Sequence, residues 1–199
     1  MQQLNDGAYN MKISRTKFFL GATILVLTLT FYKYWTPDIS HDALVAKYAN
    51  GASDFIELPS GATAHYRIWG NDEGPAVILL HGSNASLHTW EGWVTELEED
   101  YLVVTVDLPG HGLTGSTPAG DYTYTGMANF LKKFTQSLEI KEFYLSGNSM
   151  GGAVSLQYIL SYPDDILGLI LVDSAGVDIP KEAQQKVHYP LVFQLAGHW

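Results

Sequence analysis

The chain has 199 residues, which is enough for one globular domain with a buried core and hardly enough for two. Hydrophobic residues make up 46% of it and charged residues 16%, a composition that excludes a disordered chain and a coiled coil. The formal charge of −10 excludes nucleic acid as a partner, because an acidic surface repels phosphate. Since the sequence has no cysteine, disulfides, cysteine zinc sites and a thiol nucleophile are excluded as well.

The first local feature is an uncharged apolar run, residues 18–32, which lies between Lys17 and Lys33. As a helix it would cover roughly 22 Å of a hydrocarbon layer about 30 Å thick. It can therefore span a membrane when the two lysines reach toward the headgroups and Tyr34 and Trp35 lie at the interface. We expect a transmembrane anchor over residues 18–35.

A cleaved signal peptide and a helix of a soluble domain are the alternatives for this run. Cleavage requires small residues after the apolar stretch, whereas bulky residues follow here, which favours an uncleaved anchor. Basic residues before the run stay inside the cell, so residues 1–17 are expected to form a short basic cytoplasmic segment. Everything after the anchor then lies outside the cytoplasm, in the periplasm or the extracellular space.

A polar linker over residues 36–50 is expected to precede a core domain over residues 51–176. The core begins with an antiparallel hairpin, in which strands 55–58 and 64–69 flank a Pro-Ser-Gly turn. Short unbroken apolar runs, typical of buried parallel strands, then alternate with helical stretches. The expected strands are 76–80, 101–106, 143–145 and 167–172, and the expected helices are 90–99, 124–138 and 150–162. This alternation predicts an α/β fold with a mainly parallel sheet and helices on both faces.

In such sheets chemistry is found at the carboxyl ends of the strands, and the strongest motif there is Gly147-Asn148-Ser149-Met150-Gly151. It fits G-x-S-x-G between a strand and a helix, the context in which a sharp turn exposes a nucleophilic serine. Gly147 and Gly151 would remove side chains that clash with the turn. The N–H of Met150, at the positive end of the helix, would face a developing oxyanion beside Ser149.

Two further loops follow strands at the same edge. His81-Gly82-Ser83 comes directly after strand 76–80, where the N–H of Ser83 would be a second oxyanion donor. The other loop, residues 107–115, contains a literal G-x-G-x-x-G dinucleotide pattern. That pattern requires a helix to begin at the glycines, and Pro118 and Gly120 exclude one.

Together these three loops, in this order, resemble the capped serine-nucleophile branch of the α/β-hydrolase superfamily. The resemblance covers about residues 55–176 and implies strands one to six of that fold, with residues 177–199 similar to the start of a helical cap. It implies Ser149 as the nucleophile, His81 and Gly82 as the opening of the oxyanion loop, and no metal or organic cofactor.

The resemblance implies hydrolysis of small-molecule carboxylic esters through an acyl-enzyme on Ser149. Residues 147–152, GNSMGG, also resemble the elbow of hydrolases that cleave carbon–carbon bonds in ring-fission products, which is a second reading. A serine at this position excludes the relatives that use an aspartate nucleophile.

The catalytic acid and histidine of the family follow its seventh and eighth strands, which this sequence does not reach before Trp199. We therefore expect the 199-residue chain to be incomplete and poorly active, and a non-catalytic membrane-tethered module is the third reading. Asp173 is a candidate acid because some relatives place the acid after the sixth strand, and a structural aspartate at a strand end is the alternative.

Overall fold

The structure, a computed structural model, describes residues 14–176. The chain divides between Ser40 and His41 into two units, each of which is described by itself. The first contains α1, Arg15–Tyr34, whose side chains are exposed over its whole length. By length and composition α1 could cross a membrane, a criterion that a signal sequence near an N-terminus also meets. The expected single apolar helix is therefore present, and its role as an anchor stays a prediction.

The second unit begins with a short helix, α2, His41–Tyr48, inside the segment expected to be a linker. The helix was not predicted because its sequence has little apolar periodicity. Its position is fixed at its C-terminal end, where the buried guanidinium of Arg67 donates to the carbonyl oxygen of Tyr48 at 3.1 Å. Residues 41–48 thus belong to the second unit, whereas the expected linker 36–50 and core domain 51–176 stay predictions.

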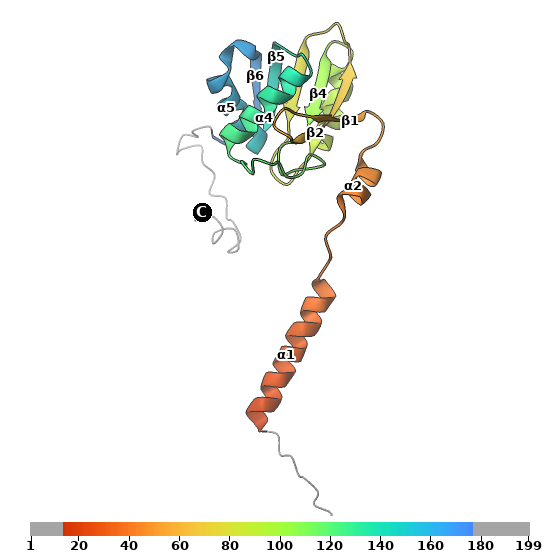
Figure 1. Cartoon of the computed structure of the whole chain (residues 1–199), viewed down its shortest axis with the longest axis vertical. Coiled ribbons are helices and arrows are strands. Elements are labelled where there is room, and N and C mark those ends of the chain that lie inside the picture. The colour runs from red at the N-terminus through yellow and green to blue at the C-terminus, as the bar shows by residue number, and fades with distance from the viewer. Residues whose placement is uncertain (1–13, 177–199) are drawn as a thin grey trace, which may run out of the picture. The chain divides into compact units, whose positions relative to one another are not determined.

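Six strands form one mixed sheet, in which β1 and β2 are the predicted hairpin and β3 to β6 are parallel (Figure 1). The order across the sheet is β1-β2-β4-β3-β5-β6, and β2 pairs antiparallel with β4. The bounds are β1 Ser53–Glu57, β2 Thr63–Gly70, β3 Ala76–Leu80, β4 Leu102–Val106, β5 Phe143–Asn148 and β6 Ile166–Val172. Each expected strand is confirmed to within two or three residues at its ends.

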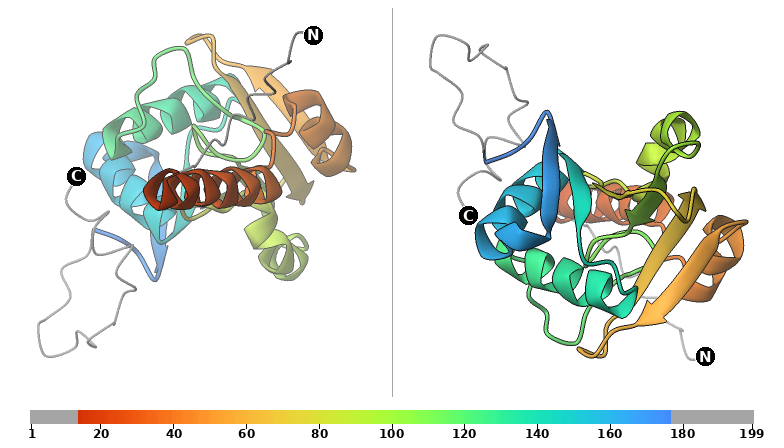
Figure 2. Two further views of the ribbon diagram at one scale, coloured as in Figure 1. Left: turned by 90° about the horizontal axis from the view of Figure 1, so that it is seen from below. Right: turned by 90° about the horizontal axis from the view of Figure 1, so that it is seen from above.

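Helices cover both faces of this sheet, as predicted (Figure 2, right). The larger core lies under α4 and α5, and the smaller one lies under η1 and α3 on the opposite face. α4 begins where the Thr123 hydroxyl accepts a hydrogen bond from the N–H of Gly126, and it buries an amphipathic face. The bounds are η1 Leu87–Trp90, α3 Glu91–Leu97, α4 Tyr124–Ser137, α5 Met150–Ser161 and η2 Pro163–Asp165.

The single helix expected over residues 90–99 is instead the pair η1 and α3, which begins three residues earlier and ends at Leu97. The glycines of the literal dinucleotide pattern lie in a loop that continues to α4, which confirms that no helix begins there. The expected start of a cap, residues 177–199, lies outside the described residues, as does most of the expected cytoplasmic segment 1–17.

Candidate active site

Ser149 lies in the sharp turn between the end of β5 and the start of α5. Its backbone has φ 49° and ψ −112°, a conformation that residues other than glycine rarely adopt. The predicted strained turn is therefore confirmed. Such strain is retained where the surrounding structure holds the residue in place, and it is typical of functional positions.

The glycines that flank Ser149 are explained by close approaches of the backbone. A β-carbon on Gly147 would overlap the backbone of Gly151 and Gly152 in the first turn of α5. A β-carbon on Gly151 would overlap the carbonyl oxygen of Leu80 at the end of β3. The two glycines therefore permit α5 to begin directly against β3, the neighbouring strand.

The end of β6 and the residues directly after it hold the main chain of the turn at Ser149 from the other side. The N–H of Ser149 donates to the carbonyl oxygen of Val172 at 3.0 Å, and the N–H of Ala175 donates to the carbonyl oxygen of Ser149 at 3.0 Å. The side-chain amide of Asn148 also donates to Val172, at 3.1 Å. Asp173 lies in this segment with φ 45° and an exposed side chain, and its role as the acid stays a prediction.

The loop after β3 comes against the serine at Gly82. A β-carbon on Gly82 would lie 3.3 Å from the β-carbon of Ser149 and 2.9 Å from Oδ1 of Asn148. Ser83 follows at an exposed position, and Met150 is the first residue of α5, where a backbone N–H has no acceptor within the helix. The structure thus brings the expected oxyanion loop beside the serine, while the donor roles of Ser83 and Met150 stay predictions.

His81 is fully buried and holds two loops together. Its Nδ1 donates to the carbonyl oxygen of Gly82 at 2.7 Å, and its Nε2 accepts from the N–H of Leu108 at 3.0 Å. Burial lowers the pKa of His81, outweighing the opposite effects of the Gly82 carbonyl and the Asp107 carboxylate. Because both ring nitrogens are occupied and the ring is neutral, His81 joins the loop after β3 to the loop after β4, and its part in an oxyanion loop stays a prediction.

Sequence reasoning missed a buried polar cluster centred on Asp107. Its Oδ1 accepts from the N–H of Leu87 at 2.8 Å, and its Oδ2 accepts from the N–H of Leu113 at 2.8 Å and from Nδ1 of His65 at 2.7 Å. Burial raises the pKa of Asp107, but these hydrogen bonds outweigh it and leave the pKa below its ordinary value. The carboxylate therefore joins β2 to the loops after β3 and β4.

The cluster continues outward through Ser53 and Arg67. Oγ of Ser53 lies 3.0 Å from Nε2 of His65 and accepts from Nε of Arg67 at 2.9 Å. The Arg67 guanidinium also donates to Oδ1 of Asn50 at 2.8 Å and to Oε1 of Glu91 at 3.1 Å. His65 and Arg67 alternate with apolar residues in β2, so both lie on one face of the strand. These two polar residues were the signal in the sequence from which the buried cluster could have been found.

Ser53, His65 and Asp107 have the connectivity of a nucleophile, base and acid, but they lie away from the elbow. The His65 and Asp107 side chains are each 1% exposed, and Asp107 spends both of its oxygens on loop amides and His65. These contacts indicate that the cluster of Ser53, His65 and Asp107 has a structural role. Within residues 14–176 no histidine is hydrogen-bonded to Ser149, whereas His188 and His198 lie outside the described residues.

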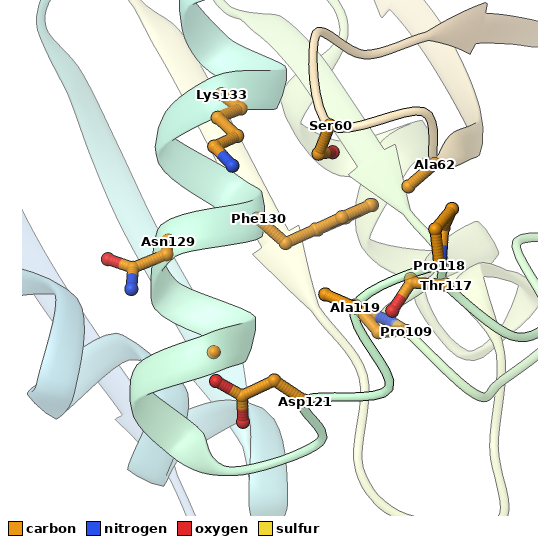
Figure 3. A pocket seen from close by; sticks show the side chains of 11 residues that line it. Ser60, Ala62, Pro109, Thr117, Pro118, Ala119, Asp121, Asn129, Phe130 and Lys133 are labelled. Atoms are coloured by element: carbon orange, nitrogen blue, oxygen red, sulfur yellow. The ribbon is translucent and has the colours of Figure 1, made fainter.

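Cavities near the carboxyl edge of the sheet include one of about 150 Å³ and one of about 520 Å³. The smaller, about 150 Å³, is enclosed by the β1–β2 turn, the loop before α4 and α4 itself, with the Phe130 ring between them (Figure 3). Its lining includes no residue of the turn 147–151 and none of loop 81–83. The larger, about 520 Å³, lies between α2 and the loops after β3 and β4, and is lined by Leu44, Tyr48, Ser86, His88, Asp107, Gly112 and Leu113.

Comparisons with known proteins agree with this geometry. The sequence profile described as alpha/beta hydrolase fold matches residues 75–195. Among curated proteins, monoacylglycerol lipase abhd6-B of Xenopus laevis is 30% identical over 171 residues, which are 85% of this chain and 47% of that protein. An uncharacterized protein of Mycobacterium tuberculosis is 35% identical over 112 residues, 56% of this chain and 32% of that protein. The chain thus spans between a third and a half of these relatives.

Solved structures give the same result. A bacterial membrane phospholipase A superposes with a TM-score of 0.62 and 28% identity, covering 85% of this chain and 55% of that one. A structure described as a putative lipase from Acinetobacter baumannii superposes with a TM-score of 0.61 and 29% identity, covering 73% of this chain and 50% of that one.

Proposed function

The chain belongs to the alpha/beta hydrolase fold family, and from this premise we propose that it is a serine hydrolase that cleaves carboxylic esters through an acyl-enzyme on Ser149. The observation that carries the proposal is the strained backbone of Ser149, with Gly82 of the neighbouring loop against it. A half-buried serine in such a turn, at the start of α5 and beside the loop at Gly82, supports the proposal, because acyl transfer requires a nucleophile next to backbone N–H groups.

In the proposed reaction Ser149 Oγ attacks the carbonyl carbon of the ester and loses its proton to a histidine base. The N–H groups of Ser83 and Met150 stabilise the oxyanion of the tetrahedral intermediate. The alcohol leaves with that proton, and water then hydrolyses the acyl-enzyme and regenerates the serine. We assign no base among residues 14–176, because none of their histidines is hydrogen-bonded to Ser149.

For the substrate class we propose lipid esters of the monoacylglycerol kind. Two of the similar proteins described above, a monoacylglycerol lipase and a membrane phospholipase A, support this class. Carbon–carbon bond cleavage has only the resemblance of residues 147–152 in its favour.

We also propose that α1 anchors the chain in a membrane with residues 41–176 outside the cytoplasm. Support comes from its length, its apolar composition and the basic residues that precede its apolar run, residues 18–32. Recovery of the protein in the soluble fraction after alkaline extraction would contradict the anchor, and protection of residues 41–176 from protease added outside the cell or spheroplast would contradict the orientation.

The enzymatic proposal is tested by ester hydrolysis in membranes of cells that produce the protein, with a monoacylglycerol and a p-nitrophenyl ester as substrates. Where a catalytic histidine completes the site, Ser149→Ala is expected to lower the protein-dependent rate about 10⁴-fold or more, as loss of a nucleophile does. Ser161→Ala, an exposed serine at the far end of α5, is the matched control and should leave the rate unchanged. Equal rates in the two variants would contradict the proposal, and absence of protein-dependent hydrolysis would favour a non-catalytic module.

A further inference from the structure

The cavity of about 520 Å³ is bounded on one side by α2, which the resemblance to the family does not include. Leu44 and Tyr48 lie one turn apart on α2 and face the cavity, and Leu113 of the loop after β4 lies in its lining as well. The exposed surface of the lining is mainly apolar. The cavity therefore offers a surface for a hydrocarbon group.

The polar members of the lining are largely committed to other partners. Asp107 is 1% exposed and accepts hydrogen bonds from two loop amides and His65. Nδ1 of His88 is bonded to Oε1 of Glu91 at 2.8 Å, whereas its Nε2 is buried without a hydrogen-bond partner among the described residues. Apart from this ring nitrogen, the charged groups of the lining are already paired with protein groups.

The wall formed by α2 is fixed by Arg67, which is 3% exposed. Its guanidinium donates to the last carbonyl of α2, that of Tyr48, and to the side chain of Asn50, two residues after the helix. The same guanidinium bonds to Glu91 on α3. Arg67 thus holds the end of α2, the residues after it and α3 together, so the cavity is not a gap beside a loose segment.

The cavity lies at the same edge of the sheet as the candidate nucleophile. Ser86 follows β3 and Leu113 follows β4, while Ser149 follows β5, and β3 lies between the other two strands. Two strand spacings separate the ends of β4 and β5 by about 10 Å. A lipid ester whose carbonyl is at Ser149 can bridge this distance with its hydrocarbon chain.

We propose that this cavity binds the hydrocarbon chain of the substrate, with Leu44, Tyr48 and Leu113 as its specificity-determining contacts. The proposal rests on the function proposed above and adds to it the place of the chain. It assigns α2, which follows the apolar helix α1 after residues 35–40 of the sequence, a direct role in binding lipid.

The test is photo-crosslinking of the full chain in lipid nanodiscs, in the Ser149→Ala background so that binding is measured without turnover. Two 16-carbon monoacylglycerol probes are used, one with a diazirine at the end of the chain and one with a diazirine next to the carbonyl. Mass spectrometry should find the distal probe on residues 41–48 and 112–114 and the proximal probe on residues 81–86.

Leu44→Trp places an indole in the cavity and should lower labelling by the distal probe at least tenfold. Ala46→Trp adds the same side chain at an exposed position of α2 outside the lining and should leave the labelling unchanged. Labelling of α1 alone by both probes, or equal labelling in the two tryptophan variants, would overturn the proposal. Loss of the proposed hydrolase activity leaves this readout intact, so the two proposals fail separately.

Discussion

Replacing Asp107 with asparagine tests whether its carboxylate holds the loops around the candidate nucleophile. The carboxylate accepts the N–H of Leu87 on one oxygen, and the N–H of Leu113 and Nδ1 of His65 on the other. An asparagine has one acceptor oxygen, so its NH₂ group must face buried donors. If the oxygen stays with Leu87, the His65 ring can change its tautomer and accept, whereas the N–H of Leu113 remains unpaired.

The magnitude follows from these contacts. A hydrogen bond to a charged group contributes about 1.5–3 kcal/mol, and a buried donor left unpaired costs about 1–3 kcal/mol. We expect Asp107→Asn to lower the free energy of unfolding by about 3 kcal/mol, a large part of the 5–15 kcal/mol typical of folded proteins. For a chain of this size that corresponds to a melting temperature roughly 6–12 °C lower.

The assay is urea unfolding of the membrane-reconstituted protein, followed by tryptophan fluorescence. Asp100→Asn removes an exposed carboxylate with the same change in charge and is expected to change the stability little. Because the folded-state pKa of Asp107 is lowered, its stabilisation is present above its unfolded pKa of about 3.9 and is lost as the pH falls through the folded pKa. The free energies of unfolding of Asp107→Asn and of the unchanged protein should therefore approach each other below about pH 4. A neutral-pH difference no larger than that of Asp100→Asn would refute the reasoning.

Three further changes test other parts of the structure. Gly147→Ala should destabilise the protein by about 3 kcal/mol in the same urea titration, because the added β-carbon overlaps the backbone of α5. The control is Gly92→Ala on α3, whose β-carbon meets no atom within 4 Å, and this change should be neutral or slightly stabilising. Because the folded-state pKa of His81 is lowered, His81 stabilises the folded protein above its unfolded pKa of about 6.5, and this stabilisation is lost as the pH falls through the folded pKa. His81→Gln should therefore flatten the decline of the urea midpoint between pH 7.5 and 5.5. Arg67→Met removes the bonds that hold the end of α2, and limited proteolysis should cut residues 41–52 faster than in the unchanged protein, with an equal rate counting against the anchoring.

The fold was predictable because its signals are local. Each parallel strand is an unbroken apolar run, and Ser149 is surrounded by the glycines that its turn requires, so the order of the elements and the strained backbone at this residue follow from adjacent residues. The position of Gly82 against Ser149 followed from the same logic, since β3 and β5 are neighbours and their carboxyl ends meet.

What the sequence concealed depends on contacts between distant segments. Asp107 and His65 are 42 positions apart, and only the antiparallel pairing of β2 with β4 brings them together. The helix α2 has weak periodicity of its own and is fixed by Arg67, which lies 19 positions beyond Tyr48. Apart from the two polar residues on one face of β2, no local pattern indicates these contacts, so neither the cluster nor the cavity beside α2 could be predicted.

The central claim is that Ser149 is the nucleophile, and the most direct measurement is to identify the residue modified by a fluorophosphonate probe. Membranes of cells that produce the protein are treated with the probe, and the labelled peptide is sequenced by mass spectrometry. The account predicts labelling on Ser149 that is lost in Ser149→Ala and retained in Ser53→Ala. Labelling on Ser53 would contradict it and would show that the Ser53–His65–Asp107 cluster is the reactive one.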